Sequence, residues 1–497
     1  MRSKLTKRGY IIDKKSVSDE DIDNLKNELT VSPAKLVVYS RNTAEINIKL
    51  YSENERYICI PRFYGINKFG EPNRNIINET LYSKFEMEYI GVLRPHQQMI
   101  VDKVLLGLKS DGGGIIVSGC GSGKTNMAIY IACALKLRTL FVSHKEFLKN
   151  QIVSRIKSFT NCQDVGIIQQ KKIEINNQFV VGIIHSLSMI DYDKTIFDDF
   201  GLIVIDEVHH MGARRFSQFY KKITAKYMLG ISAEHDRSDK LYKIINWYMG
   251  PILHREEQKP NNMVIAKRYF FKTKNIKRSK VIYNMNLGGL DTPRMITNIV
   301  YIRRRNNLIA NIINILHEQD KNILFLTGRL LHVDIIYNLL ESNDFTKGHV
   351  GKYIGGMKQI DLNESATKQI ILGTYNMAEE GLDIENLNVV ILSTSKCSIK
   401  QSVGRILRKE IYIDNPIIID IVDVNNSRFV TEASRRYKYY KSKEYITHEF
   451  NVSDYELDDY MMYNDIDKLT KSILSKSENK QIIDDNINED YDVDFID

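Results

Sequence analysis

The sequence predicts an α/β protein in which two tandem domains, each built on a parallel β-sheet, follow a small α+β N-terminal extension. Three observations carry this prediction. The chain has 497 residues, which is too many for one compact core. Hydrophobic residues make up 43% of it, enough to fill sizeable interiors. Short apolar runs rich in β-branched residues alternate with helix-length segments in two series, as strands buried on both faces of parallel sheets do.

The first 88 residues predict the small extension. The charged segment "DEDIDNLKNELT" is typical of an exposed helix, whereas "AEINIKLYSE" and "YICIPRFYGI" alternate as half-buried strands do. Residues 1–88 are therefore expected to form an α+β unit ahead of the first large domain.

Residues 89–255 carry the first series of apolar runs and are expected to form the first parallel-sheet domain. The predicted strands are "GIIVS", "RTLFVS", "FVVGIIH", "GLIVIDE" and "MLGIS". Segments of helical length, such as "NMAIYIACAL", lie between them. This alternation is the sequence pattern of a parallel sheet.

Beyond this domain the pattern loosens and then restarts. Residues 256–300 are expected to form a basic connection, in which "KRYFFKTKNIKRSK" holds seven basic residues and no acid. Residues 301–450 are expected to form the second domain, with the predicted strands "KNILFLTG", "GKYIGG", "TKQIILGTY", "NVVILST" and "PIIIDIVD". Residues 451–497 are expected to form an acidic tail, because residues 484–497 hold seven acids and no base.

The composition excludes several classes of protein. The five cysteines show no CxxC pair and no His/Cys spacing suited to zinc, so neither a disulfide framework nor a zinc site is expected. No apolar run approaches the length that spans a bilayer, and the N-terminal "MRSKLTKRGY" has no apolar h-region after its basic residues. We therefore expect no membrane association and no secretion, and hence a cytoplasmic or nuclear protein. The net charge of +8 tilts the expectation modestly towards polyanionic partners.

The stretch "SGCGSGKT", residues 118–125, lies between a predicted strand and a predicted helix. This setting and this pattern predict a phosphate-binding P-loop, with Ser118 where the pattern has its first glycine. Lys124 is expected to reach the β- and γ-phosphates of a nucleoside triphosphate, and the Thr125 hydroxyl to bind Mg²⁺. A glycine-rich turn beside a surface lysine is the alternative. The residues expected to hold the nucleotide here are Gly119, Cys120, Gly121, Ser122, Gly123, Lys124 and Thr125.

The apolar strand of "GLIVIDEVHH" delivers two carboxylates at its end. Asp206 is expected to bind Mg²⁺, and Glu207 to orient and deprotonate the water that attacks the γ-phosphate. His209 is expected to serve catalysis, with a simple cap as the alternative, whereas His210 is expected at the surface.

These residues resemble superfamily 2 helicases and translocases, in particular the DExH branch that includes XPB-like repair helicases, type I and III restriction subunits and poxviral transcript-release helicases. The tetrad Asp206-Glu207-Val208-His209 and the form "CGSGKT" carry the resemblance, which covers about two thirds of the chain, from Gly91 to Asp423. It implies two RecA-like domains that hydrolyse ATP with Mg²⁺ and move along nucleic acid. The extension and the Ile-, Asn- and Lys-rich composition are similar to helicases of large DNA viruses, including giant viruses.

Further motifs follow in the family's order. "LRPHQQ" implies that Gln97 recognises adenine, and "ILGTYNMAEEGLDI" implies nucleotide contacts for Gly381 and Asp383. "QSVGRILR" matches the Q-x-x-G-R-x-x-R signature. It implies that Gln401 contacts the nucleotide and that Arg405 and Arg408 reach the γ-phosphate from the second domain, as arginine fingers do.

One segment departs from the family. Relatives carry "SATPxRxDGL" where this chain has "SAEHDRSDKL", residues 232–241, so Glu234 and His235 replace the Thr-Pro pair. The family uses this segment to couple hydrolysis to movement. ATP hydrolysis is therefore a firmer expectation than strand separation.

Contacts to nucleic acid are expected where the two domains present strand ends. The resemblance implies backbone contacts from residues of both domains, namely Ser143, His144, Lys145, His185, Ser186, Thr374 and Tyr375. The basic, aromatic segments Lys267–Lys280 and Arg435–Tyr445 predict either nucleic-acid contact or a solvated face of a strand or helix.

The expected function is therefore that of an ATP-dependent helicase or translocase, with ATP and Mg²⁺ as cofactors. DNA is favoured as its partner and RNA is the alternative, and the kinship suggests viral transcription or repair, in the host cytoplasm and in the virion. Two other functions stay open, an ATP-gated nucleic-acid clamp, suggested by Glu234, and the motor subunit of a restriction-type enzyme.

Overall fold

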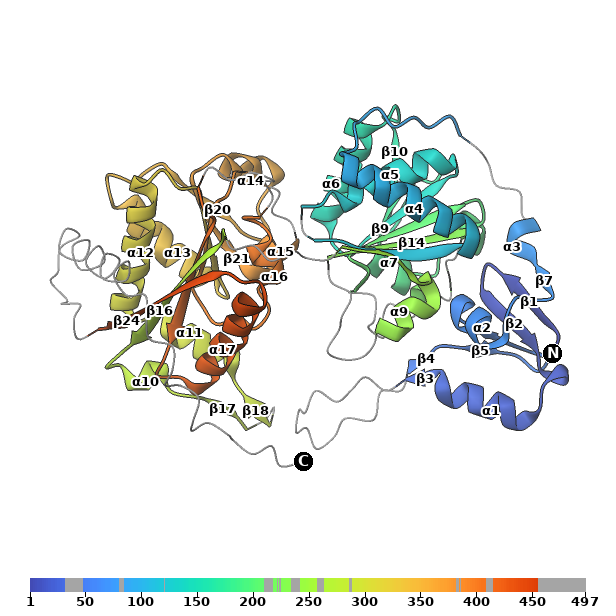
Figure 1. The fold of residues 1–497 in the computed structure, drawn as a ribbon, viewed down its shortest axis with the longest axis horizontal. Helices are drawn as coiled ribbons and strands as arrows, with labels where there is room; N and C mark the ends of the chain where they lie inside the picture. The colour runs from blue at the N-terminus through green and yellow to red at the C-terminus, as the bar shows by residue number, and fades with distance from the viewer. Residues whose placement is uncertain are drawn as a thin grey trace. The chain divides into compact units, whose positions relative to one another are not determined.

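The computed structural model describes two compact units, residues 1–258 and residues 259–497 (Figure 1). The residues it describes are 1–31, 48–79, 85–119, 121–209, 218–220, 222, 225–233, 242–256, 263–285, 288–380, 384, 386–407 and 414–454. The predicted acidic tail lies outside them, apart from its first four residues. Both units are α/β, so the predicted fold class is confirmed.

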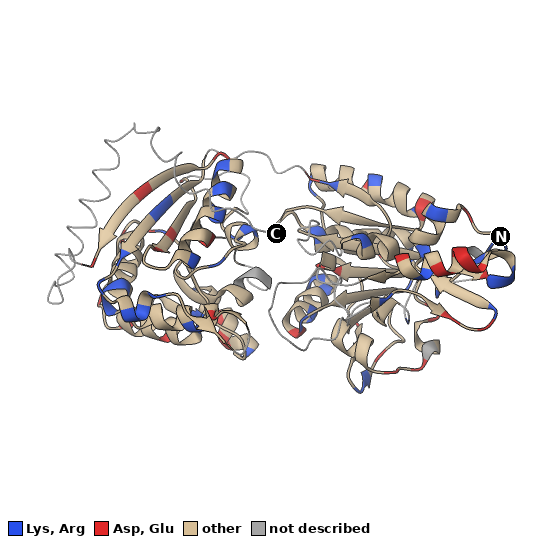
Figure 2. Cartoon of the chain, turned by 90° about the horizontal axis from the view of Figure 1, so that it is seen from below, with Lys and Arg blue, Asp and Glu red and all other residues tan. Residues whose placement is uncertain are grey.

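The N-terminal extension is a small five-stranded mixed sheet in the order β5-β6-β2-β1-β7. Helix α1 begins after Ser18, whose side chain accepts from the N–H of Asp21, and its first turn carries three acids that complement the helix dipole (Figure 2). The elements are β1 (Ser3–Thr6), β2 (Gly9–Asp13), η1 (Lys14–Ser16), α1 (Asp19–Glu28), β3 (Thr30–Val31), β4 (Ile48–Lys49), β5 (Ser52–Glu53), β6 (Tyr57–Ile60), α2 (Arg62–Phe69), β7 (Arg74–Asn75) and α3 (Ile76–Glu79).

The first large sheet has eight strands in the order β11-β10-β12-β9-β13-β14-β8-β15, and only β11 runs antiparallel to its neighbour. The five strands predicted from the sequence are confirmed. The strands are β8 (Gly113–Val117), β9 (Thr139–Ser143), β10 (Val165–Gln169), β11 (Lys172–Ile173), β12 (Phe179–Ile183), β13 (Leu202–Asp206), β14 (Tyr227–Ser232) and β15 (Ile252–Arg255). The other elements are α4 (Pro95–Asp111), α5 (Lys124–Leu135), α6 (Glu146–Phe159), α7 (Ile184–Met189), η2 (Lys194–Phe197) and α9 (Tyr242–Met249).

Both faces of this sheet are covered, which explains its continuous apolar strands. On β8, Ile116 packs with α4, α5 and α6 on one face, whereas Ile115 and Val117 pack with α7 and α9 on the other (Figure 1). Helix α4 ends at Asp111, and the left-handed conformation of its C-cap Gly112 (φ 79°) lets the chain turn directly into β8.

The extension is docked on the second of these faces. The guanidinium of Arg62, at the start of α2, donates to the carbonyl oxygen of Lys226 at 2.9 Å, and the Tyr248 hydroxyl of α9 donates to the carbonyl oxygen of Leu50 at 3.1 Å. The rings of Tyr64 and Trp247 meet edge to face, 5.1 Å apart. The extension and the first large domain therefore share one apolar core.

The second unit holds a seven-stranded parallel sheet in the order β20-β21-β19-β22-β23-β16-β24. Here too the five predicted strands are confirmed. The strands are β16 (Ile265–Lys272), β19 (Ile323–Thr327), β20 (Val350–Tyr353), β21 (Ile370–Thr374), β22 (Val389–Leu392), β23 (Ile417–Asp423) and β24 (Ile446–Ser453), with the small pair β17 (Tyr283–Asn284) and β18 (Gly289–Leu290). The helices are α10 (Ile276–Ser279), α11 (Thr292–Val300), α12 (Arg303–Glu318), α13 (Leu330–Glu341), α14 (Gln359–Ala366), α15 (Tyr375–Glu380), α16 (Lys400–Val403) and α17 (Ser427–Ser442).

Strand β16 begins this sheet earlier than the sequence pattern suggested. It belongs to the segment predicted as a basic connection, yet it pairs with β23 on one side and with β24 on the other. Tyr269 and Phe271 point into the core and are 1% exposed. The half of the basic segment that forms β16 is therefore part of the sheet, with Arg268 buried, Lys267 half-buried and Lys272 exposed.

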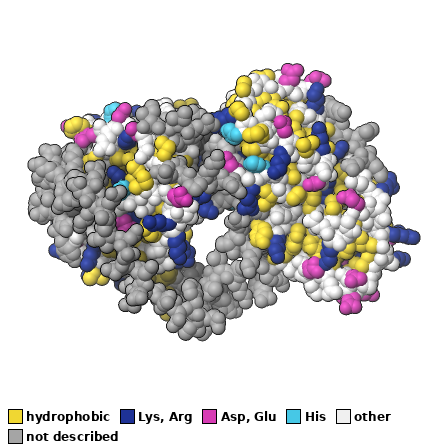
Figure 3. All heavy atoms as spheres, in the orientation of Figure 1, with side chains coloured by type: hydrophobic (Ala, Val, Ile, Leu, Met, Phe, Trp, Pro, Cys, Tyr) yellow, Lys and Arg dark blue, Asp and Glu magenta, His cyan; other side chains and the backbone are white. Residues whose placement is uncertain are grey.

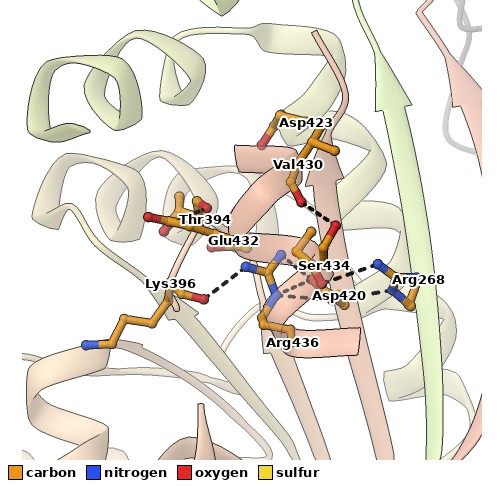
Figure 4. A network of polar contacts seen from close by, with 12 residues as sticks. Arg268, Thr394, Lys396, Asp420, Asp423, Val430, Glu432, Ser434 and Arg436 are labelled. Carbon is orange, nitrogen blue, oxygen red and sulfur yellow. Dashed lines mark hydrogen bonds and ion pairs between the residues drawn. The ribbon is translucent and has the colours of Figure 1, made fainter. Parts of the chain in front are cut away.

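A buried ion-pair network joins α17 to the middle of this sheet (Figure 4). Asp420 of β23 receives Arg436 of α17 through both Nε and Nη2, the shorter distance being 2.7 Å, and it also accepts from the Tyr440 hydroxyl at 3.2 Å. Arg268 of β16 lies 3.8 Å from the same carboxylate. The interpretation of Arg435–Tyr445 as a nucleic-acid contact is thus wrong for Arg436 and Tyr440, because both are buried by this network.

Charged side chains elsewhere are spread over both units (Figure 2). On the face of the first unit drawn in Figure 3, hydrophobic and charged side chains are interspersed, as is ordinary for protein surfaces. Within the part of the chain that the structure describes, no helix is both long enough and apolar enough to cross a bilayer.

The ion-pair network predicts a difference between two adjacent arginines of α17. Replacing Arg436 by alanine leaves the Asp420 carboxylate buried without its main partner and should lower the free energy of unfolding by about 3–5 kcal/mol. Replacing the exposed Arg435 by alanine should change it by less than about 0.5 kcal/mol. Urea unfolding of the full chain, followed by circular dichroism, measures both. Equal effects of the two changes would contradict the energetic role of the network.

A buried histidine makes the second unit sensitive to acid. His332 of α13 is fully buried, with Nδ1 2.9 Å from Thr327 Oγ1 and Nε2 3.2 Å from Asn306 Oδ1. Because the amide oxygen of Asn306 only accepts, Nε2 carries the proton and the neutral ring satisfies both contacts. Burial, and after it the charge of Arg305, lowers the pKa of His332 well below its ordinary value.

This pKa predicts a loss of stability in acid. Below about pH 6.5 the unfolded chain binds a proton at this histidine, whereas in the folded chain the ring stays neutral until much lower pH. The free energy of unfolding therefore falls as the pH drops below about 6.5. The slope from this group is about 1.4 kcal/mol per pH unit. His332→Gln should flatten the dependence of the unfolding midpoint on pH between 5 and 7, and His349→Gln, at an exposed histidine, should leave it as it is. Parallel pH profiles for wild type and His332→Gln would refute this assignment.

Candidate functional site

The glycine-rich loop joins β8 to α5 at the carboxyl end of the first sheet. Gly121 and Gly123 have φ angles of 81° and 82°, a conformation that side chains rarely adopt, so two of its glycines are required by the backbone. Gly119 has open space around it, where a Cβ would meet nothing within 4 Å. Cys120 lies outside the described residues.

Lys124 and Thr125 begin α5 and are both 8% exposed. The ammonium group of Lys124 turns back into the loop and donates to the carbonyl oxygens of Ser118 at 2.8 Å and Gly119 at 2.9 Å. The positive charge therefore sits inside the loop, at the helix N-terminus, where an anion would also be favoured.

Gln97 ties helix α4 to this loop. Its Oε1 accepts from the N–H of Arg94 at 2.9 Å, as a capping box requires, and its Nε2 donates to the carbonyl oxygen of Ser122 at 2.8 Å. A Cβ on Gly123 would lie 2.3 Å from that Nε2, so the glycine also makes room for the glutamine. The sequence predicted a nucleotide contact for Gln97, and the structure places its side chain against the loop.

Glu256, directly after β15, is a residue that sequence reasoning missed. Its carboxylate accepts from the Ser118 hydroxyl and, at 3.1 Å, from the N–H of Gly119, while its own N–H donates to the carbonyl oxygen of Val117 at 2.8 Å. This contact accounts for the serine at the first position of the loop. The departure of Ser118 from the pattern was the available signal, but nothing in the sequence pairs it with a residue so far along the chain.

Asp206 and Glu207 stand at the end of β13, two strands away from the loop in the sheet. Glu207 has a φ of 48°, an uncommon conformation for a residue with a side chain, and its N–H donates to Asp206 Oδ1 at 3.0 Å. The sharp turn directs the two neighbouring carboxylates to the same edge of the sheet.

His209 connects these carboxylates to the next strand. Its Nδ1 lies 2.8 Å from the Ser232 hydroxyl and 3.3 Å from Glu207 Oε2, and the N–H of Ala233 donates to the same Glu207 oxygen at 3.5 Å. Glu207 is therefore linked to the start of the segment that the family uses for coupling. The rest of that segment, including Glu234, and also His210 lie outside the described residues.

Positively and negatively charged side chains influence one another at the carboxyl edge of the first large sheet. Burial raises the pKa of Asp206 to about 6, with a further contribution from Glu207, while the positive charges of Lys124 and Arg155 oppose the rise. Burial lowers the pKa of His144, and the carboxylates of Asp206 and Glu207 act in the opposite direction. These mutual effects group His144 of the β9–α6 turn with the carboxylates.

The residues predicted to contact a nucleic-acid strand have different surroundings. Ser143, Ser186 and Tyr375 are buried, at 1%, 5% and 3% exposure. The Tyr375 hydroxyl donates to the carbonyl oxygen of Thr394 at 2.6 Å, and Ser186 accepts from the N–H of Gln170 at 3.1 Å. The side chains of Ser143, Ser186 and Tyr375 therefore lie in the interior of their domains. His185 is exposed, and His144, Lys145 and Thr374 are half-buried.

In the second unit, the loop after β22 leads to α16, which carries Gln401, with Gly404 and Arg405 just beyond it. The network of Figure 4 anchors this loop to α17, because Arg436 donates to the carbonyl oxygen of Lys396 at 3.0 Å and Ser395 donates to Glu432. Gln401 and Arg405 are half-buried. Gly381, Asp383 and Arg408 lie outside the described residues.

The described residues contain no cluster of three or more His, Cys, Asp or Glu that could hold a metal ion by themselves. The two residues expected to bind Mg²⁺, Thr125 and Asp206, supply one hydroxyl and one carboxylate. Oxygen ligands in such small number suit Mg²⁺, which keeps several waters and takes further ligands from a phosphate.

Comparison with known proteins agrees with this geometry. A protein-family model described as the res subunit of type III restriction enzymes matches residues 90–237. A protein of Acanthamoeba polyphaga mimivirus, named as an ATP-dependent RNA helicase, is 52% identical over 476 residues, which are 95% of this chain and 92% of that protein. A protein of invertebrate iridescent virus 6, named as a helicase, is 25% identical over 422 residues, covering 76% of this chain and 92% of that protein.

Among solved structures, S. cerevisiae Dbp5 bound to RNA and ADP BeF3 matches with a TM-score of 0.51 at 13% identity, covering 77% of this chain and 98% of that one. This likeness supports the fold alone, two tandem RecA-like domains. The mimivirus relative is similar over nearly its whole length, so the chain belongs to the superfamily 2 DExH helicases, in the group of ATP-dependent helicases found in giant and other large DNA viruses.

Proposed function

We propose that the loop of residues 118–125 binds the phosphates of the ATP that this helicase uses. The observation that carries the proposal is the position of the Lys124 ammonium, held inside the loop by two carbonyl oxygens of its own chain. Phosphate oxygens are stronger acceptors for an ammonium group than neutral carbonyls are. Lys124 would exchange one set of acceptors for the other, with the N–H groups of residues 119–125 around the phosphates.

Mg²⁺ fits this proposal through Thr125 and Asp206. When bound, the ion would neutralise charge on the β- and γ-phosphate oxygens. Gln97 is proposed to recognise the base, as the resemblance implies, from its place beside the loop. Cys120, Gly381, Asp383 and Gln401 are proposed as further nucleotide contacts on the same ground.

Glu207 is proposed as the general base. Its carboxylate would accept a proton from the attacking water, and His209 with Ser232 would hold it in position. The resemblance assigns Arg405 and Arg408 to the same reaction, as arginine fingers that stabilise charge on the γ-phosphate. The link from Glu207 to Ala233 supports coupling between hydrolysis and the segment that follows.

Nucleic acid is the partner that helicases move along, and its kind is part of the proposal. We propose DNA, in viral transcription or repair, because of the kinship with XPB-like and poxviral enzymes. RNA is the second candidate, and the specific observation in its favour is the name of the mimivirus relative, which states RNA. An ATP-gated clamp with little strand separation is a third, on account of Glu234.

The proposed site predicts losses of ATP turnover that can be ranked. Glu207→Gln removes the base and should lower nucleic-acid-stimulated turnover by about 10²–10⁴, and Arg405→Ala by about 10³ or more. Lys124→Ala should abolish both ATP binding and turnover. Lys109→Ala, at an exposed lysine of α4, is the matched control and should keep wild-type turnover. Steady-state phosphate release measures the ATP turnover of all four variants. Turnover that persists in Lys124→Ala would contradict the proposal.

The choice of strand can be measured separately. ATP turnover titrated with single-stranded DNA and RNA of one sequence should show half-maximal stimulation at a lower concentration of DNA. Strand displacement on tailed duplexes of each kind then distinguishes a helicase from a clamp. Stimulation by RNA alone would replace DNA with RNA as the substrate, and stimulation without displacement would favour the clamp.

A further inference from the structure

A basic cavity of about 640 Å³ lies in the second unit. It opens where β16 and β24 end and where α12 begins, at the carboxyl edge of the parallel sheet. Its charged lining comes from three segments far apart in sequence, namely Lys274, Lys277, Arg278, Arg303, Arg304 and Asp454. Five cations therefore face one acid.

The one acid of the lining, Asp454, is engaged in hydrogen bonds that stabilise the wall of the cavity. Asp454 Oδ2 accepts from the Thr273 hydroxyl at 2.6 Å and from the N–H of Lys274 at 2.8 Å, and Arg304 donates to the carbonyl oxygen of Asp454. These bonds join the end of β24 to the turn after β16. The side chains of Lys274, Lys277 and Arg303 are exposed, and those of Arg278 and Arg304 are half-buried.

The start of α12 adds to the positive field. Ile302 stands at its N-cap and has no polar side chain, and the first three residues of the helix are all arginines. Cations are unfavourable at a helix N-terminus, where the helix dipole is positive. Arg305 is compensated by its ion pair with Asp423 at 2.6 Å, inside the unit. Arg303 is exposed beside the cavity, where an anion would offset both its charge and the dipole.

The cavity also offers an aromatic surface. Tyr301 is 51% exposed, and the guanidinium of Arg278 lies 4.9 Å from its ring centroid. Proteins commonly bind single-stranded nucleic acid with cations beside an exposed aromatic ring. The cations contact the phosphate backbone, and the ring stacks on a base.

We propose that this basic cavity binds the phosphate backbone of single-stranded nucleic acid, with a base on Tyr301. The inference deepens the proposed function and rests on it, since it extends the strand contacts to the β16–β24 side of the second sheet. It also gives a role to the part of the basic segment that does not enter the sheet, residues 273–280.

Equilibrium binding at several salt concentrations tests the proposal on the full chain. The probe is a fluorescein-labelled 20-nucleotide strand, as DNA and as RNA, measured by anisotropy. Lys277→Gln with Arg303→Gln should weaken binding at least tenfold at low salt. Each phosphate contact to a single strand contributes about 0.7 to the slope of log affinity against log salt, so this pair should lower the slope by about 1.4.

A matched control removes the same charge elsewhere. Lys15→Gln with Lys347→Gln replaces two exposed lysines that do not line the cavity and should shift affinity less than twofold, with the slope unchanged. If both pairs weaken binding equally, net charge and not the cavity is responsible, and the inference fails. If wild type binds neither probe, the proposed function fails as well. Inorganic triphosphate that competes with the strand in wild type but not in Lys124→Ala would place the phosphate contacts in the glycine-rich loop and overturn the inference.

The aromatic contact has its own measurement. Tyr301→Ala should weaken strand binding about fivefold or more with the salt slope unchanged, because stacking involves no counter-ion release. Tyr301→Phe keeps the ring and should bind as wild type does. Equal binding by wild type and Tyr301→Ala would remove the base-stacking part of the proposal.

Discussion

Both large sheets consist mainly of parallel strands that are buried on both faces, and this constraint decides where chemistry can occur. A strand whose side chains all enter the core has no position for a functional group along its length. Polar residues must follow the strand, at its carboxyl end. The glycine-rich loop after β8, the carboxylates after β13 and Ser232 at the end of β14 all obey this rule. So does the basic cavity, which opens where β16 and β24 end.

The sequence revealed these strands because their apolar runs are local. It also predicted roles for Asp206 and Glu207, at the end of a predicted strand, and for Lys124, at the start of the helix that follows the glycine-rich loop. It did not reveal the partners of the loop, because the contacts of Glu256 with Ser118 and of Gln97 with Ser122 join residues far apart in the chain. Similarity to known families supplied roles for Gln97 and Arg405 that no local pattern could have given.

Basic, aromatic segments were the least decidable part of the sequence, and the structure divides them. Arg268 and Arg436 enter the core, where the carboxylate of Asp420 compensates the cost of burying their charges and also accepts from the Tyr440 hydroxyl. Lys277 and Arg303 stay exposed beside the cavity. The buried and the exposed cations come from segments of similar basic and aromatic composition. What differs is whether a carboxylate on a neighbouring strand can pair with the cation, and the order of strands in the sheet determines this.

The N-terminal extension is fused to the first large domain by a common core. Phe63 of α2 lies so close to Gly113 that a Cβ there would come within 2.5 Å of its ring, and Tyr64 covers Trp247. A shortened chain that begins at the helicase motifs would therefore expose a broad hydrophobic surface on β8 and α9. Such a fragment would be prone to aggregate, and failure to purify it would say nothing about the motor itself.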